Sequence, residues 1–357
     1  MTHTTSTTFA HPGLLNSQAR LHDFASKANS TEPSAIKAGY EAMLKEKYAS
    51  LGYPFQPYAI IEVLPGELTP TEKQFKEDSA AAYVLALRWV QSNDPRYRDR
   101  AIEILDGWAS TYQRMNSPKS TVQPQLESAW SAPVWANAAE IIKHHAQGAA
   151  GWPADKVAQF NRFLDKLYVE AEKAKGRTDS NWGASAGLAM ISVGVFQDNR
   201  ARYDAGVEVI KTAMPRLILS GSGRLTELEG RQDCHHPQYT LSAFVEAAET
   251  VYNQGSPELY EVKYKNDVRP RLSMGLQYMA RTVLTGEGFD CSHTKLSTYS
   301  ELAVRYYQGQ NLQLPDLFLA AGVRPLRFLK EFPIWGHVTH GNDRTSADLA
   351  KQPAATA

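Results

Sequence analysis

Apolar residues recur at intervals of three and four positions along most of the chain, the spacing of one face of an α-helix. This pattern predicts about a dozen helices. They are expected at residues 18–28, 33–51, 71–91, 96–112, 126–145, 153–175, 181–195, 201–219, 239–252, 268–284, 299–308 and 317–321. Outside residues 58–63, no convincing alternation of apolar and polar positions predicts a strand.

The predicted helices follow one another in pairs joined by short polar links, which favours an all-α fold, either an (α/α) toroid or a helical solenoid. No glycine-rich phosphate loop follows a strand, which argues against an α/β nucleotide-binding fold. The connection at 52–70, rich in proline and glycine, is long enough to act as a lid. Residues 1–8 and 342–357 are polar and are expected to be disordered, which leaves 9–341 as a single domain.

Charge and hydropathy limit the choice of partners. Lys and Arg together number 38, as do Asp and Glu, and a neutral chain is a poor candidate for nucleic-acid binding. No apolar run approaches the ~20 residues of a membrane span, so no membrane partner is expected. The N-terminus lacks the apolar core of a signal peptide, so either the protein is intracellular or a signal has been removed. Cys234 and Cys291 are either free thiols or one disulfide, and the sequence leaves both open.

Groups that bind anions or transfer protons concentrate in three segments. The first is a loop that leads into a helix and contains Arg231, Asp233, His235, His236, Gln238 and Tyr239. Such a set is costly to bury without a function. The second segment, 177–183, places Asn181 and Trp182 at the start of a helix, which favours an anion, although a helix N-cap explains Asn181 equally well. The third, 290–301, contains Tyr299, which core packing would also explain.

A metal site fits these residues poorly. His235, His236 and His293 could be ligands, but adjacent histidines point in different directions and no His-x-x-x-His pair lies on one helix. His144 and His145 lie at a helix end and are expected to form a solvated last turn. We therefore expect no metal and no cofactor.

Several motifs resemble, in the same order, those of alginate-lyase-domain proteins. Residues 9–15, Phe-Ala-His-Pro-Gly-Leu-Leu, are similar to the family's Phe-Val-His-Pro-Gly opening, and 78–108 are similar to the helix pair that follows it. Residues 137–142, Asn-Ala-Ala-Glu-Ile-Ile, also match. Asn181-Trp182 resembles an Asn-Trp motif, and 231–238 resemble Arg-Asp-x-x-His-x-Gln with one residue inserted. The resemblance covers about residues 9–330, and the order of the motifs is more specific than any one of them.

The resemblance implies a polysaccharide lyase on an incomplete (α/α) barrel, built from successive helical hairpins. Such enzymes cleave a 4-linked uronic-acid polymer by β-elimination, so the expected partner is an anionic uronan polysaccharide or oligosaccharide. The C5 proton of a uronate becomes acidic once its carboxylate is neutralised. A base then removes that proton, and an acid protonates O4 of the leaving sugar.

Residue by residue, the resemblance gives Asn181 the role of carboxylate neutraliser and His236 that of base or second neutraliser. Arg231 binds the carboxylate or orients the tyrosine. The alignment places an apolar residue at Tyr239, so Tyr299 is preferred as the acid. The family's alginate-specific members often have Asn-Asn-His where this chain has Ser-Asn-Trp, so mannuronate-rich alginate and glucuronan both remain candidate substrates. The expected substrate-binding residues are Trp130, Trp182, His235, Gln238 and Tyr239, with core packing as the alternative for the two tryptophans.

Two other functions remain open from the sequence. One is an (α/α)-barrel glycoside hydrolase that uses Glu227, Glu229 or Asp233, although glycosidase carboxylates normally come from separate elements. The other is a non-catalytic protein that binds a uronan. The family resemblance implies a secreted or periplasmic protein, whereas the N-terminus by itself leaves a cytoplasmic location open.

Overall fold

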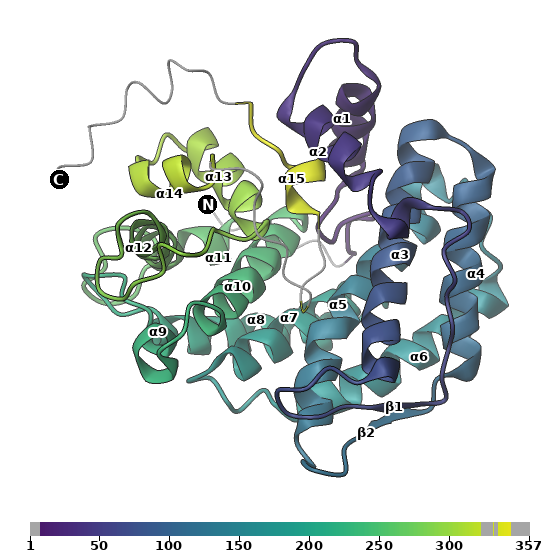
Figure 1. The fold of residues 1–357 in the computed structure, drawn as a ribbon, viewed down its shortest axis with the longest axis horizontal. Coiled ribbons are helices and arrows are strands. Elements are labelled where there is room, and N and C mark those ends of the chain that lie inside the picture. Colours follow the sequence, from purple (N-terminus) through teal and green to yellow (C-terminus); the bar gives the residue numbers. More distant parts are fainter. Residues whose placement is uncertain (1–7, 323–330, 332–334, 344–357) are drawn as a thin grey trace.

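The computed structural model of the protein describes residues 8–322, 331 and 335–343 (Figure 1). Its long helices are α1 (Gln18–Asn29), α3 (Pro70–Ser92), α4 (Pro95–Thr111), α5 (Gln123–His144), α6 (Ala154–Glu172), α7 (Asn181–Phe196), α8 (Arg200–Leu217), α10 (His236–Asn253), α12 (Arg271–Thr285) and α13 (Tyr299–Gly309). Its short helices are α2 (Ala35–Met43), α9 (Thr226–Arg231), α11 (Glu258–Glu261), α14 (Pro315–Ala320) and α15 (Gly336–Thr339). Single 3₁₀ turns occur at Lys47–Ala49 and His145–Gln147.

Two layers of helices form the body of the fold. Helices α3, α5, α7 and α10 make up an inner layer, in which each helix contacts the next. Helices α4, α6 and α8 pack outside them, each against the inner helix that precedes it in the sequence (Figure 1). The chain therefore runs as successive helical hairpins, and the predicted all-α fold of the (α/α) toroid class is confirmed.

The close approach of α7 and α8 depends on small residues. A Cβ atom added at Gly187 of α7 would lie 2.8 Å from Cδ1 of Ile210, and one added at Gly206 of α8 would lie 2.8 Å from the carbonyl oxygen of Gly187. Larger side chains at these positions would force the helices apart and weaken their packing. The small-residue pattern thus lets α7 be buried along almost its whole length.

The structure differs from the sequence-based prediction in a few short elements. The strand expected at 58–63 is β1 (Ile60–Glu62), and it pairs in parallel with β2 (Arg114–Asn116), which lies in a segment predicted to be a loop. Three-residue strands contain too few positions to show an alternating pattern. The helix expected at 33–51 is instead α2 and a separate 3₁₀ turn.

The N-terminal segment is fastened to the body of the fold by His11. Its Nδ1 lies 2.7 Å from Oε1 of Glu140, and its Nε2 lies 3.0 Å from Oδ1 of Asp198. The ring of His144 stacks on that of His11 with centroids 4.1 Å apart, so the expected solvated turn is partly covered. Nearly parallel stacked rings cannot both direct an in-plane lone pair at one ion, so this arrangement fits a hydrogen-bonded clasp better than a metal site.

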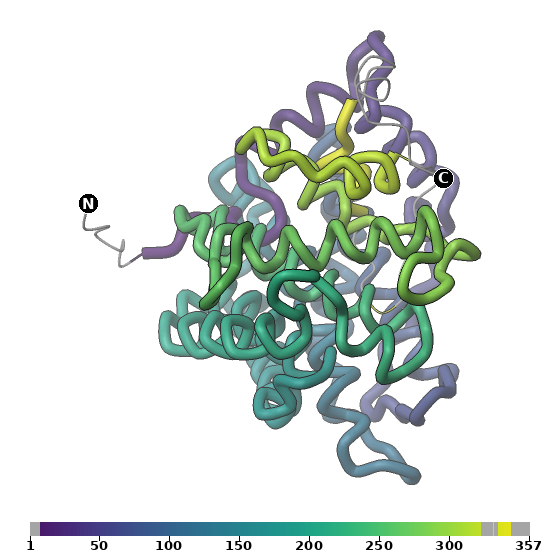
Figure 2. Tube along the Cα trace, turned by 90° about the vertical axis from the view of Figure 1, so that its left-hand side faces the viewer, coloured from purple at the N-terminus to yellow at the C-terminus, as the bar shows by residue number. Residues whose placement is uncertain are grey.

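The same segment also reaches the far end of α10, where the backbone N–H of Ala10 donates to Oε1 of Gln254 over 2.8 Å (Figure 2). Near the other end of the chain, Asn342 donates from Nδ2 to Oε2 of Glu301 over 2.7 Å. The rest of the termini that were expected to be disordered, 1–7 and 344–357, lies outside the described residues. Among the helices that are described, none has both the length and the apolar character to cross a membrane.

Candidate active site

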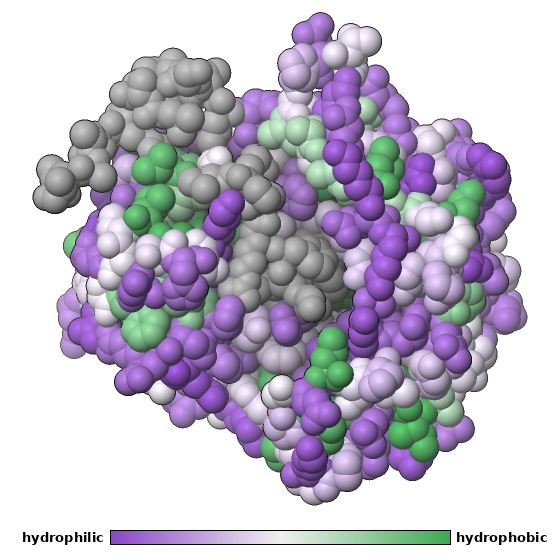
Figure 3. Space-filling model, in the orientation of Figure 1, coloured by the Kyte–Doolittle hydropathy of each residue, from purple (hydrophilic) through white to green (hydrophobic). Residues whose placement is uncertain are grey.

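A cleft of about 630 Å³ lies where the four inner helices begin. Its walls come from the N-terminal parts of α3, α5, α7 and α10, from the end of α9, and from residues 64–68 of the connection that was expected to be long enough to act as a lid. Helix N-termini carry partial positive charge, so four of them in one place favour a negatively charged ligand. The face drawn in Figure 3 is mainly hydrophilic, with apolar groups in small separate patches.

The cleft brings together five residues that the sequence had singled out: Trp130, Trp182, Arg231, His236 and Tyr239. The ring of Tyr239 lies between two others, with its centroid 5.4 Å from that of Trp130 and 5.6 Å from that of His236. Arg231 is exposed at the end of α9. A guanidinium, an imidazole and a phenol thus line one cavity.

Asp233 fixes both the start of α10 and the orientation of His236. Its Oδ1 accepts the backbone N–H groups of His235 and His236 over 2.7 and 2.9 Å, and its Oδ2 lies 2.6 Å from Nδ1 of His236. Burial alone would raise the pKa of Asp233, but these hydrogen bonds hold it below its ordinary value. An ionised carboxylate only accepts hydrogen bonds, so the His236 proton sits on Nδ1 and Nε2 is left as the basic atom.

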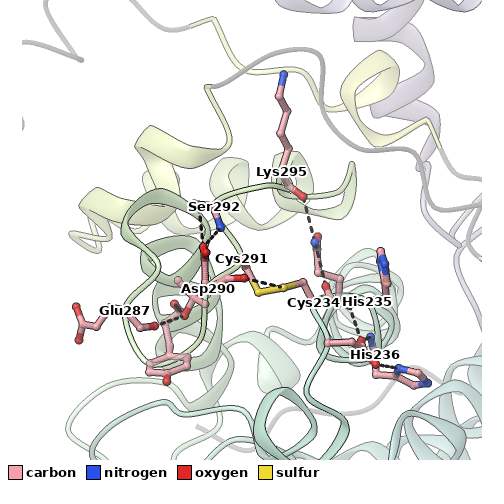
Figure 4. Close-up of a disulfide and its surroundings, with 12 residues drawn as sticks. Cys234, His235, His236, Glu287, Asp290, Cys291, Ser292 and Lys295 are labelled. Atoms are coloured by element: carbon pink, nitrogen blue, oxygen red, sulfur yellow. Dashed lines mark hydrogen bonds and ion pairs between the residues drawn. A yellow bond between two sulfur atoms is a disulfide. The ribbon is translucent and has the colours of Figure 1, made fainter.

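The loop that carries these residues is tied to the connection between α12 and α13. Cys234 and Cys291 form a disulfide, which settles the alternative that the sequence left open (Figure 4). Gln238, which is fully buried, donates from Nε2 to the carbonyl oxygen of Lys295 over 3.0 Å and accepts the backbone N–H of Ser297 over 2.8 Å. Gln238 therefore joins two loops and is not among the residues that line the cleft.

Two further candidates also lie outside the cleft lining. Tyr299 is fully buried, and its hydroxyl is 3.5 Å from Oε1 of Gln238. His235 is exposed, and its ring points away from that of the adjacent His236 (Figure 4). Of the two tyrosines considered as the acid, the structure therefore places Tyr239 in the cleft and Tyr299 in the core.

Asn181 lies just below the cleft, between two residues that line it, Ser180 and Trp182. It is almost fully buried, and both its backbone N–H and its Nδ2 donate to Oε1 of Glu227, over 2.8 and 2.9 Å. The other oxygen of Glu227 accepts the hydroxyl of Thr240. One amide proton of Asn181 is thus committed to Glu227, while the second has no partner within the described residues.

One cluster in the cleft wall was not found from the sequence. Lys76 places its Nζ 2.7 Å from Oε1 of Glu72 and 2.6 Å from Oε2 of Glu127, and 5.2 Å from the ring centroid of Trp130. Burial and the Glu127 carboxylate raise the pKa of Glu72 to about 7, and Lys76 opposes that rise. Glu72 and Lys76 are four residues apart on α3, but Glu127 comes from α5, and no spacing rule connects two separate helices.

The alginate lyase family model matches residues 14–289. That match spans well over half of the chain. This chain belongs to the alginate lyase family. It is accordingly a polysaccharide lyase, as the sequence motifs had implied.

Solved alginate lyases have the same fold as this family member. Alginate lyase A1-III from Sphingomonas species A1 is 16% identical, with 96% of this chain and 100% of that chain covered and a TM-score of 0.68. A variant of A1-III complexed with a tetrasaccharide gives 16% identity, 93% and 98% coverage and a TM-score of 0.68. An alginate lyase from Bacteroides ovatus is 12% identical, with 87% and 96% covered and a TM-score of 0.63. Among curated proteins, none matches the chain.

In this alginate lyase family member, Trp182 lines the cleft at the start of α7. Its ring lies 4.2 Å from the guanidinium carbon of Arg177, which also lines the cleft. Sequence reasoning singled out the segment that contains Arg177 without assigning Arg177 a function. Its position in the sequence could have identified Arg177, because it lies just before Asn181 and Trp182, in the turn that leads into α7.

Proposed function

We propose that this lyase cleaves a 4-linked uronan by β-elimination in the cleft at the start of the inner helices. The observation that carries the proposal is the meeting of Arg231, the Asp233–His236 pair and Tyr239 around one cavity. β-Elimination needs a cation for the substrate carboxylate, a base and an acid. Each of these is offered by one of the three groups.

In the proposed mechanism, the exposed guanidinium of Arg231 binds the carboxylate of the uronate whose C5 proton is removed. The second amide proton of Asn181 supports it from below the cleft. Together they stabilise the negative charge that develops on the carboxylate as the proton leaves, which is where such stabilisation lowers the barrier.

His236 then removes the C5 proton with Nε2, because Asp233 holds the other ring proton on Nδ1. The electron pair of the C5–H bond forms the C4=C5 double bond, and the C4–O4 bond breaks. The Tyr239 hydroxyl donates its proton to O4 of the leaving sugar. The products are a new non-reducing end with a 4,5-unsaturated uronate and a shorter chain. The imidazolium and phenolate return to their starting states by proton exchange with solvent.

Tyr239 takes the place of Tyr299 in this mechanism. Tyr239 lines the cleft beside His236, whereas the Tyr299 side chain has no exposed surface. An acid must come within hydrogen-bond reach of the oxygen that it protonates. A residue buried in the core would need a rearrangement of its packing to do so.

The substrate we propose is mannuronate-rich alginate or glucuronan. Both polymers place a carboxylate on every sugar. Four converging helix N-termini and exposed arginines favour the binding of such a negatively charged chain. Trp182 and Trp130 would supply aromatic faces for sugar rings. The Cys234–Cys291 disulfide supports export, because disulfides persist in oxidising compartments such as the periplasm or the cell exterior.

The hydrolase alternative is less well supported, because its candidate carboxylates already have partners. Glu227 accepts from Asn181 and Thr240, and Glu229 forms a bidentate pair with Arg224. Asp233 is bonded to two backbone N–H groups and a histidine.

Chain cleavage of alginate and glucuronan distinguishes the two reactions. Elimination produces the ultraviolet absorbance of the conjugated double bond in step with new chain ends, whereas hydrolysis produces reducing ends without that absorbance. Binding of either polymer without cleavage would instead support the non-catalytic alternative.

A further inference from the structure

A second cavity of about 500 Å³ adjoins the cleft on the side of α9. Three residues, Arg177, Ser180 and Arg231, line both cavities. The second cavity also has Thr226 and Asp179 in its walls. Its volume falls within the ~300–1,000 Å³ typical of small-molecule sites. The two spaces thus form one path that passes two guanidinium groups.

Arg177 and Arg231 differ from most arginines on this surface. Neither has a carboxylate partner within the described residues, whereas Arg224, a few positions before Arg231, forms a bidentate pair with Glu229. The guanidinium carbon of Arg177 lies over the Trp182 ring, 4.2 Å from its centroid. This contact uses the face of the guanidinium and none of its N–H groups. A guanidinium held in this way is ready for bidentate binding of a carboxylate.

The acidic residues of the second cavity do not cancel the preference of the two arginines for a carboxylate. One oxygen of Glu227 accepts hydrogen bonds from Asn181 and the other accepts from Thr240, so both oxygens already have donors within the protein and are not offered to Arg177 or Arg231. Asp179 is exposed at the cavity wall, where its carboxylate can accept a hydrogen bond from a hydroxyl. A cavity with arginines and a hydroxyl acceptor suits a sugar acid, which carries both a carboxylate and hydroxyl groups, better than an inorganic anion.

We propose that the second cavity is a subsite for a further uronate of the substrate chain, and that Arg177 binds the carboxylate of that sugar. This inference rests on the proposed function, because it assumes that the ligand of the cleft is a uronan. Arg231 serves the sugar at the cleavage point, and Arg177 serves a sugar further along the chain, beyond the two sugars that flank the cleaved bond. The protein then gains affinity with each substrate that is long enough to reach the second cavity.

Direct binding tests this proposal without relying on turnover. The probes are size-defined mannuronate or glucuronate oligosaccharides, titrated calorimetrically into the Tyr239→Phe variant and into the same variant that also carries Arg177→Ala. We expect Arg177→Ala to weaken binding of a hexasaccharide about tenfold, as for loss of one exposed charge-assisted hydrogen-bonded pair, and to change binding of a disaccharide less than twofold. Arg177→Lys should recover part of the loss, because lysine keeps the charge but not the bidentate geometry.

Lys175→Ala is the matched control, since Lys175 lies two residues away and is paired with Glu172. It should bind both oligosaccharides as the parent variant does. Equal hexasaccharide affinities with and without Arg177→Ala would overturn the subsite, as would a loss of the same size for both lengths. Failure of the wild-type protein to cleave any uronan would reject the proposed reaction, whereas a length-dependent loss in Arg177→Ala would still uphold the subsite.

Discussion

Replacement of Asp233 by asparagine tests the proposed base directly. In the wild-type protein, Oδ1 of Asp233 is held by the backbone N–H groups of His235 and His236, and Oδ2 faces Nδ1 of His236. Asparagine keeps its oxygen toward those two backbone donors, because its amide nitrogen cannot accept a hydrogen bond. Its NH₂ group then faces Nδ1 and donates to it, so the imidazole proton moves to Nε2, the atom that has to act as base.

The magnitude follows from the two interactions that change. The charge-assisted hydrogen bond between Asp233 and His236 contributes about 1.5–3 kcal/mol, and the side chains are 30% and 33% exposed, which favours the lower part of that range. When the ring returns to the active tautomer, the Nδ1–H of His236 faces the amide N–H of the new asparagine, and this unfavourable contact adds about 1–2 kcal/mol. The sum of about 3 kcal/mol corresponds to a loss of roughly a hundredfold in kcat/KM.

The assay is the initial rate of double-bond formation on the preferred uronan, measured for the wild type, Asp233→Asn and Asp233→Ala. Urea denaturation supplies the control. Asp233→Asn keeps the backbone hydrogen bonds at the start of α10 and a neutral bond to His236, so it should lower the free energy of unfolding by only about 1 kcal/mol. Asp233→Ala loses all of these bonds and should cost about 2–3 kcal/mol. If Asp233→Asn keeps kcat/KM within threefold of the wild type, then His236 is not a base oriented by Asp233.

Three further changes test other parts of the site. Tyr239→Phe should lower kcat about 10²–10⁴-fold with little change in binding, whereas Tyr299→Phe should mainly reduce stability; the reverse result would restore Tyr299 as the acid. The pKa of Glu72 is raised from 4.5 to about 7, so its contribution to stability is complete below pH 4.5 and is lost as the pH rises through about 7. As the pH rises through this range, the Tm should therefore fall less for Glu72→Gln than for the wild type or for the control Glu77→Gln, which lies on the same helix outside the cleft. A fall in Tm as large as that of the wild type would contradict the raised pKa of Glu72. The disulfide closes a loop with a sequence separation of 57, so Cys234→Ser/Cys291→Ser should lower the free energy of unfolding by about 4 kcal/mol in urea, and a loss below about 1 kcal/mol would refute that contribution.

Long helices could be predicted from the sequence because each presents several turns of the same pattern to the core. Helix α7, for example, was expected at 181–195 and is found at Asn181–Phe196. The six-residue α9 was missed, because it is too short to show a period. Yet α9 carries Arg231 and Glu227, so the local structure of the site was less predictable than the fold that supports it.

The site itself could be predicted in composition but not in geometry. The segment 231–239 was found because it is unusually dense in Arg, His and Tyr, and three of its residues do line the cleft. Sequence could not show that Gln238 faces a second loop, or that Tyr239 points into the cleft while Tyr299 is buried, because such directions depend on how α10 packs against the α12–α13 connection. The Lys76 cluster joins two helices about fifty residues apart, and only the fold brings them together.

Product analysis of the wild-type protein distinguishes β-elimination from hydrolysis. Alginate and glucuronan are each incubated with the full chain, and chain cleavage is followed together with ultraviolet absorbance and the mass of the oligosaccharides. We expect cleavage of at least one uronan to give products that absorb and are lighter by one water molecule than the hydrolysis products. Cleavage that gives only saturated ends, or no cleavage of either polymer, would contradict the proposed β-elimination.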